Sequence, residues 1–183
     1  MIINKTELSG LYNISLEPIM DDRGFFVRSF CLNEISACRE DLNIVQVNHT
    51  MTKEKGTVRG MHYQLPPACE TKIVRCIRGA VFDVAVDLRE GSSTFLKWYG
   101  EILSAENMKM LLIPEGFAHG FQTLEENCEM LYLHSEFYQK KYEAGIMFDD
   151  PEIGISWKLP VAGISDRDSK HPFINSSFRG MKL

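Results

Sequence analysis

The sequence has no excess of positive charge and no long apolar run. Its 20 lysines and arginines are outnumbered by 25 aspartates and glutamates, which gives a formal net charge of −5. Because nucleic-acid binding needs a basic surface, this balance argues against a nucleic-acid partner, while a local basic pocket for an anionic ligand stays compatible with it. No apolar run approaches the roughly 20 residues of a membrane-spanning helix, so we expect no membrane association.

Cysteine is sparse and follows no ligand or disulfide pattern. The five cysteines contain no C-x-x-C pair, and an odd number leaves at least one unpaired. The polar residues Asn4 to Thr6 come too early for the apolar part of a secretory signal. We therefore expect reduced thiols and a cytoplasmic protein.

Long segments with the 3.6-residue period of amphipathic helices are also absent, as are linkers, low-complexity tracts and repeats. Short strand-like runs recur instead, separated by turn residues about every ten residues. With 183 residues, 44% of them apolar, the chain is large enough for one sizeable core. We predict a single all-β domain over residues 1–183, with a loop-rich C-terminal tail from about residue 160.

The clearest local pattern is a β-hairpin formed by Lys72–Ile77 and Ala80–Leu88 around Arg78-Gly79. In its second arm Phe82, Val84, Val86 and Leu88 share one face, and Asp83, Ala85 and Asp87 share the other. One short helix is predicted at Asn33–Leu42, with Asn33 as its cap. Further strands are expected at Gly24–Phe30, Val45–Met51, Phe95–Leu103, Lys109–Ile113, Gly120–Leu124 and Cys128–Ser135.

His62 is the first candidate for chemistry. Strict alternation in its strand would place His62 and Gly60 on one face and Arg59 and Met61 on the other. A half-buried structural histidine is the plain explanation for a lone residue of this type. Its ordinary pKa of about 6.5 also makes imidazole a suitable neutral base near physiological pH.

Lys72 and His119 are the next candidates. Lys72 opens an apolar strand, where a lysine usually reaches to water at a sheet edge. Inside a pocket it would instead offer a cation to a developing enolate or to phosphate. His119 follows the turn Pro114-x-Gly116, where a histidine often bonds only to backbone. A base, an ammonium group and a second imidazole on neighbouring strands suit removal of a proton next to a carbonyl.

Other polar residues become candidates for a site only if they lie near His62, Lys72 and His119. Tyr132 lies in an apolar strand, where a tyrosine is usually part of the core, but a phenol also delivers protons. Asp168 lies in the polar tail and would fix the tautomer of a histidine if the two met. Three arginines offer forked donors for a diphosphate, although each alone is an ordinary surface residue: Arg23, Arg59 and Arg167.

Together these segments resemble the dTDP-4-dehydrorhamnose 3,5-epimerase family of the cupin superfamily. The resemblance extends from about Ile14 to Asp168, with several motifs in the family's order and spacing. The motifs are Asp22-Arg23-Gly24-Phe25-Phe26, Arg59-Gly60-Met61-His62-Tyr63-Gln64, Phe82 to Arg89, Leu103 to Asn107, Ile113 to Phe121, and Asp150-Pro151 through Trp157.

The resemblance implies a cupin-type jelly-roll barrel with a few short helices, a homodimer, and a nucleotide-diphosphate-sugar substrate with no cofactor or metal. It implies epimerisation of a dTDP-linked 4-keto-6-deoxy sugar at C3 and C5 in deoxysugar biosynthesis. His62 would be the base oriented by Asp168, Tyr132 the acid on the opposite face, and Lys72 the partner of the enolate oxygen. The implied substrate-binding positions are Arg23, Gln46, Asn48, Arg59, His119, Glu143 and Arg167.

The sequence departs from the family pattern at Arg28, Val47, Phe137, the lysine-to-arginine position Arg167, and Glu70-Thr71, where Gln-Gly is usual. These departures leave the nucleotide and the exact sugar open. Within the same chemistry, a 3- or 5-epimerase that inverts one centre and a ketoisomerase stay open. A metal-dependent cupin using His62, His119 and Glu70 and a non-catalytic sugar-binding protein are alternatives from other classes.

Overall fold

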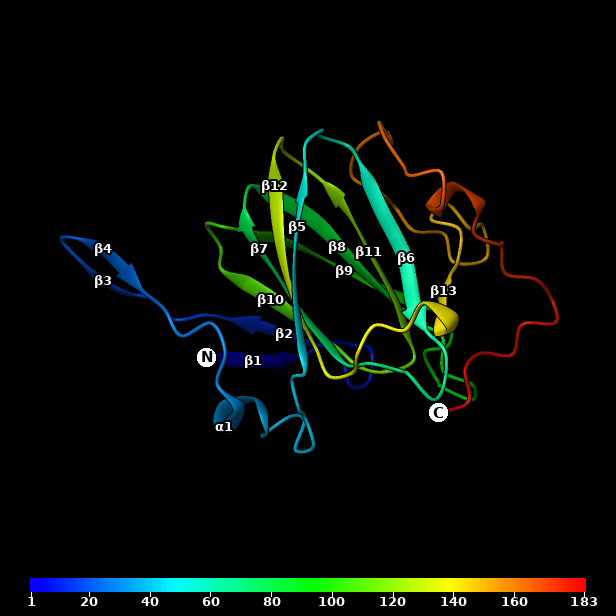
Figure 1. The fold of residues 1–183 in the computed structure, drawn as a ribbon, viewed down its shortest axis with the longest axis horizontal. Helices are drawn as coiled ribbons and strands as arrows, with labels where there is room; N and C mark the ends of the chain where they lie inside the picture. Colours follow the sequence, from blue (N-terminus) through cyan, green and yellow to red (C-terminus); the bar gives the residue numbers. More distant parts are fainter.

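The computed structural model describes residues 1–183 and contains two antiparallel sheets that face each other (Figure 1). In spatial order, the six-stranded sheet contains β1 (Ile2–Lys5), β2 (Tyr12–Ser15), β10 (Lys109–Ile113), β7 (Lys72–Arg78), β12 (Cys128–His134) and β5 (Gln46–Thr52). The five-stranded sheet contains β13 (Glu143–Gly145), β6 (Val58–Gln64), β11 (Phe117–Thr123), β8 (Ala80–Asp87) and β9 (Trp98–Ser104). The chain crosses repeatedly between the sheets, as in a jelly roll, which confirms the all-β prediction. The sheets are not joined into a closed barrel.

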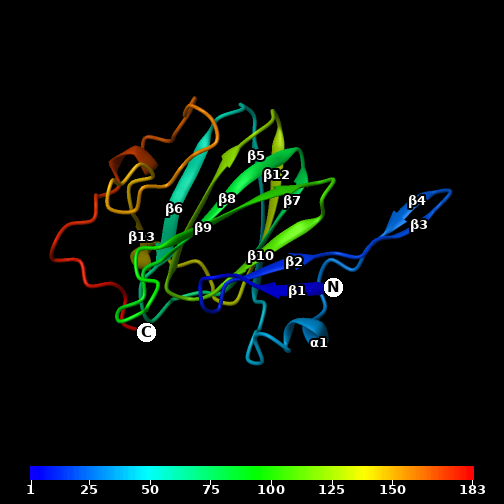
Figure 2. The same ribbon diagram turned by 180° about the vertical axis from the view of Figure 1, so that it is seen from behind.

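Apolar side chains form three layers around these sheets. The middle layer fills one end of the space between them and includes Val74, Ala85, Leu111 and Phe121. A second cluster lies outside the five-stranded sheet, where the C-terminal segment covers it (Figure 2). A third lies outside the six-stranded sheet beneath α1 (Leu32–Ile35). Because the middle layer packs against the inner faces of both sheets, they are held at a fixed separation, and the remaining interior space is available for a site.

Strands β7 and β8 confirm the two predicted strand segments, but the predicted hairpin was wrong. Strand β7 pairs with β10 and β12 in one sheet, and β8 pairs with β11 and β9 in the other. The two faces of β8 are as expected. Phe82, Val84, Val86 and Leu88 belong to the outer cluster, whereas Ala85 belongs to the middle layer. The predicted helix Asn33–Leu42 was wrong in its bounds, because α1 ends at Ile35 and its N-cap is Cys31. The strand predicted to reach Phe30 ends at Phe26. No helix of the structure has the length and apolar character needed to cross a membrane.

One small hairpin stands apart from the two sheets. Strands β3 (Ile19–Asp21) and β4 (Gly24–Phe26) pair only with each other and extend away from the body (Figure 1). Their large apolar side chains are mostly exposed: Ile19, Met20, Phe25 and Phe26. A two-stranded hairpin is marginally stable by itself in water. This projecting hairpin therefore presents an apolar surface that the rest of the chain does not cover.

The expected strict alternation in β6 was wrong. His62 pairs with His119, but Arg59 pairs with Phe121, so three steps along β6 match two steps along β11. The extra residue falls at Gly60, whose φ is 134°. This irregularity puts Arg59 and His62 on the same, inner face of the sheet, whereas alternation would have separated them.

We expect Gly60→Ala to destabilise the fold by about 3 kcal/mol, from backbone strain and overpacking combined. A methyl group at Gly60 would lie 2.5 Å from Gly120 Cα and 2.9 Å from the His119 carbonyl oxygen. Urea denaturation measures the loss. Gly91→Ala is the control, because Gly91 also has a positive φ (74°) but no neighbour within 4 Å, so it should cost only about 1 kcal/mol. Equal losses in the two variants would contradict a clash at Gly60.

Candidate active site

Polar side chains from both sheets converge on one cavity of about 260 Å³. The five-stranded sheet contributes His62 from β6 and His119 from β11, and the six-stranded sheet contributes Lys72 from β7 and Tyr132 from β12. The other lining residues are Asn48, Thr50, Arg59, Tyr63, Gln64, Glu70, Phe121, His134, Tyr138, Glu143 and Arg167. An imidazole therefore faces an ammonium group and a phenol across the space between the sheets.

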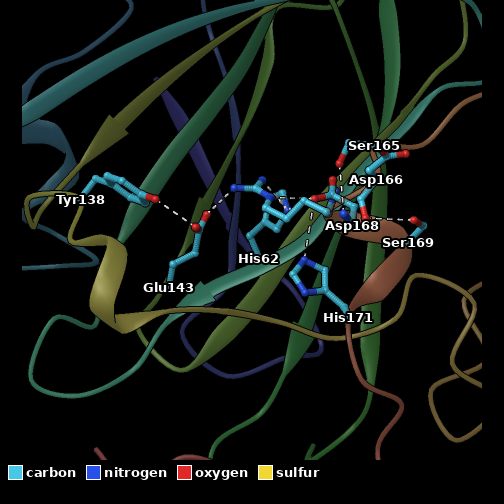
Figure 3. Close-up of polar contacts among 10 residues, drawn as sticks. His62, Tyr138, Glu143, Ser165, Asp166, Asp168, Ser169 and His171 are labelled. Carbon is cyan, nitrogen blue, oxygen red and sulfur yellow. Dashed lines mark hydrogen bonds and ion pairs between the residues drawn. The ribbon is translucent and has the colours of Figure 1, made fainter.

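His62 is held by a carboxylate from the C-terminal segment (Figure 3). Its Nε2 lies 2.8 Å from Oδ1 of Asp168, which begins the short 3₁₀ helix η2 (Asp168–Lys170). The other oxygen, Oδ2, accepts the Gly60 backbone N–H at 3.1 Å. Burial by itself would raise the pKa of Asp168, but these bonds and the His62 charge hold it well below the usual range. An ionised carboxylate only accepts hydrogen bonds, so Nε2 of His62 donates, and Nδ1 carries the free lone pair of a base.

The rim of the cavity is a second polar network beside His62 (Figure 3). Arg167 donates to Oε1 of Glu143 at 2.8 Å and to Oδ1 of Asp168 at 3.1 Å. The hydroxyl of Tyr138 donates to the other Glu143 oxygen at 2.9 Å. This network connects the loop after β12 to the segment that carries Asp168.

His171 lies next to the pair formed by His62 and Asp168. Its Nε2 is 3.7 Å from Asp168 Oδ1 and has no hydrogen-bond partner, and burial lowers its pKa. The ligand atoms of His62, Asp168 and His171 fall within 4.8 Å of one another, a spacing that a cation could use. Arg167 lies 3.0 Å from His62 and 3.1 Å from Asp168, so its guanidinium charge opposes a cation at this position.

Lys72 is buried on the opposite wall with a carboxylate partner. Its Nζ lies 2.7 Å from Oε1 of Glu70, and Oε2 of Glu70 lies 2.8 Å from Nδ1 of His134. Burial opposes ionisation of Glu70, but the charge of Lys72 and the bond from His134 outweigh it and lower the pKa of Glu70 to about 2. Lys72 is only 6% exposed, and this pairing keeps its ammonium charge facing the cavity.

His119 and Tyr132 complete the inner wall. Both oxygens of Asp83 lie 3.0 Å from Nε2 of His119, and complete burial raises the pKa of Asp83 despite that partner. The ring of His119 meets the ring of Tyr132 edge-on, with centroids 6.1 Å apart. Burial raises the pKa of Tyr132, whose hydroxyl is 3.5 Å from Thr50 Oγ1. The phenol is therefore a protonated group and a potential donor.

Most residues singled out in the sequence come together here, but not all. Eight line the cavity: His62, Lys72, Tyr132, Asn48, Arg59, His119, Glu143 and Arg167. Asp168 lies behind His62, and Gln46 bonds to Asn48 at 3.3 Å without lining the cavity. Arg23 lies on the projecting hairpin, where its side chain is 90% exposed and paired only with Asp21.

Sequence reasoning missed the carboxylate partners that hold Lys72 and His119. Asp83 lies two residues from Ala85 in β8 and therefore shares its inward face. This alternation could have suggested a buried carboxylate that needs a partner. His134 lies two residues after Tyr132 and shares its face of β12. Glu70 lies two residues before Lys72, just ahead of the start of β7. That spacing was the available signal, but their contact with each other joins segments 64 residues apart.

A jelly-roll sandwich with acid–base groups on opposing walls of one cavity defines an acid–base enzyme of the cupin type. The sequence pattern of the dTDP-4-dehydrorhamnose 3,5-epimerase family matches residues 5–176. The chain therefore belongs to this family of isomerases, and the resemblance seen in the sequence is confirmed.

Individual relatives agree with this assignment. The dTDP-4-dehydrorhamnose 3,5-epimerase of Shigella flexneri is 44% identical over 169 residues, which cover 92% of this chain and 93% of the relative. The crystal structure of the enzyme from Elizabethkingia anophelis is 37% identical and superposes with a TM-score of 0.91, over 97% of this chain and 98% of that one. The epimerase of Legionella pneumophila, solved in complex with dTDP-4-keto-L-rhamnose, is 34% identical with a TM-score of 0.91, over 100% and 98% of the two chains.

Glu70 should give the protein a defined acid dependence of stability. Its folded-state pKa of about 2 lies below its ordinary value of 4.5, so its stabilising contribution is complete above pH 4.5 and declines as the pH falls toward 2. The difference in unfolding free energy between the wild type and Glu70→Gln should therefore shrink by about 2 kcal/mol from pH 6 to pH 3. Urea denaturation at a series of pH values measures it. A difference that does not change with pH would contradict an ionised, paired Glu70.

Proposed function

We propose that this protein inverts C3 and C5 of a dTDP-linked 4-keto-6-deoxy sugar by enolate-forming acid–base catalysis, as a step in deoxysugar biosynthesis. The observation that carries the proposal is the placement of His62 on one sheet and of Lys72 and Tyr132 on the facing sheet, around one cavity. Inversion of a carbon centre requires a base on one face of the sugar ring and an acid on the other. This geometry supplies both.

Each step has a group on the correct wall. The C4 ketone acidifies the hydrogens at C3 and C5, and neutral His62 removes one of them, while Asp168 stabilises the imidazolium that forms. Lys72 holds the negative charge that develops on the ketone oxygen. Tyr132, protonated because burial raises its pKa, then delivers a proton to the opposite face of the same carbon. One proton leaves the carbon and one proton returns to it, so the sugar is neither oxidised nor reduced overall. The reaction therefore needs no redox cofactor.

The remaining polar residues suit the nucleotide part of the substrate. Arg59 and Arg167 line the cavity and offer forked donors to a diphosphate. Glu143, Asn48 and His119 add polar contacts on the same lining, and Gln46 orients Asn48 through their hydrogen bond. The five cysteines are free thiols, which supports a cytoplasmic location for the enzyme.

We expect His62→Ala to lose solvent deuterium exchange at both C3 and C5, because the other imidazole on its wall, His119, is buried and bonded to Asp83. The assay incubates the protein with dTDP-4-keto-6-deoxyglucose in D₂O and follows ring deuteration by NMR. The rate should fall by about 10²–10⁴-fold. The control is His49→Ala, since His49 is exposed on β5 and bonds only to Glu129. Normal exchange in a folded His62→Ala protein would remove the base assignment, and exchange at only one carbon in the wild type would indicate a single-centre epimerase.

Arg23 extends the proposal to a homodimer. The projecting hairpin carries four exposed apolar residues on its strands and Arg23 at its turn, and it extends away from the two sheets (Figure 1). Arg23 does not line the cavity of its own chain. Exposed apolar surface of this kind marks an interaction site. In the proposed dimer the hairpin packs on a second copy of the chain and brings Arg23 to the diphosphate end of that copy's cavity.

A mixed-dimer experiment tests this arrangement. Arg23→Ala should raise KM by about tenfold, because a charge-assisted contact to phosphate is lost, and His62→Ala should be inactive. Dimers formed from one copy of each variant should regain activity at low substrate concentration, because one site then has both an intact His62 and the partner's intact arginine. If mixing restores nothing, or the wild type is a monomer by light scattering, the shared site is wrong.

A further inference from the structure

We propose that Glu70 and His134 are positioning residues that fix Lys72 through a hydrogen-bond chain that ends at the Glu70 carboxylate. The inference rests on the proposed function, because it concerns the ammonium group assigned there to the ketone oxygen. Glu70 stands at one of the positions where the sequence departs from the family pattern described above. Neither residue is assigned a part in the acid–base steps above.

The direction of the chain is set at its outer end. The backbone N–H of Tyr138 donates to Gln46 Oε1 at 3.1 Å, so the other amide atom of Gln46 is the nitrogen, which donates to Asn48 Oδ1 at 3.3 Å. Asn48 therefore presents its Nδ2 to His134 Nε2, 3.3 Å away. Because Nδ2 is only a donor, His134 Nε2 must accept.

This result fixes the state of His134. An imidazole that accepts at Nε2 is neutral and carries its proton on Nδ1. That N–H points at Oε2 of Glu70, 2.8 Å away, and the second carboxylate oxygen pairs with Lys72 at 2.7 Å. Every link from Tyr138 to Lys72 is then a donor meeting an acceptor, with no mismatch along the chain.

The chain determines where the ammonium group lies. Lys72 and His134 are cross-strand partners in the pairing of β7 with β12, and Glu70 bridges their side chains on the cavity face. The carboxylate occupies one of the three ammonium N–H groups, which leaves two to meet an oxygen in the cavity. Glutamine at position 70 has only one acceptor oxygen, so it serves either Lys72 or His134 and leaves the other donor facing an amide N–H₂.

The test compares kcat and KM for Glu70→Gln, His134→Leu and His134→Gln with those of the wild type. Glu70→Gln and His134→Leu should lower kcat by about 10- to 100-fold, with KM changed less than about threefold, because a misplaced group loses transition-state contacts. His134→Gln should recover kcat to within about threefold, because its amide accepts from Asn48 and donates to Glu70.

Recovery of kcat in His134→Gln separates a positioning role from simple filling of space. Leucine fills the position without making the two hydrogen bonds, whereas glutamine can make both. If Glu70→Gln does not fold, the two His134 variants carry the comparison.

Two outcomes would overturn the inference. Wild-type kcat in His134→Leu would reject the chain, and equal losses in His134→Leu and His134→Gln would show that the imidazole itself acts. If only the positioning role is wrong, the wild type still exchanges deuterium at C3 and C5, so the proposed function stands. Its absence in the wild type would reject the proposed function and the inference together.

Discussion

The site depends on the fixed separation of two facing sheets. Apolar residues fill one end of the space between them, and further apolar clusters lie on the outer faces. The other end holds the polar cavity, with His62 on one wall and Lys72 and Tyr132 on the other. A base and an acid on one strand would share a face of the substrate. In the proposed mechanism, distribution over two sheets allows protons to leave and arrive on opposite faces of a sugar ring.

Burial of so many polar groups is tolerated because each charge has a partner. Asp168 pairs with His62, Asp83 with His119, and Glu70 with Lys72. An unpaired charge in such a site would cost several kcal/mol. In the proposed mechanism the same pairing also prepares the reacting groups, because each carboxylate orients an imidazole or an ammonium group, while Tyr132, which has no charged partner, stays protonated. Stability and catalytic competence therefore share the same contacts.

The local patterns in the sequence predicted the sheet strands well and the distant contacts poorly. Alternation in β8 placed Phe82 and Ala85 on the correct faces, since that strand is regular. It failed at Arg59, because the irregularity at Gly60 depends on close contact with Gly120 on another strand. Asp168 and Tyr132 gained roles only through the resemblance to a family, and the contact of Glu70 with His134 had no local signal. Arg23 lies outside its own cavity, so one chain alone does not place it.

The stereochemical course of a Tyr132→Phe variant tests the central claim most directly. The variant is incubated with dTDP-4-keto-6-deoxyglucose in D₂O, and NMR reads both the deuterium content and the configuration at C3 and C5. If the phenol is the acid on the wall opposite His62, deuterium should enter with retained configuration, because His62 still removes and returns protons on its own face, and the inverted product should be lost. Inverted product formed at the wild-type rate would contradict the opposed-wall account.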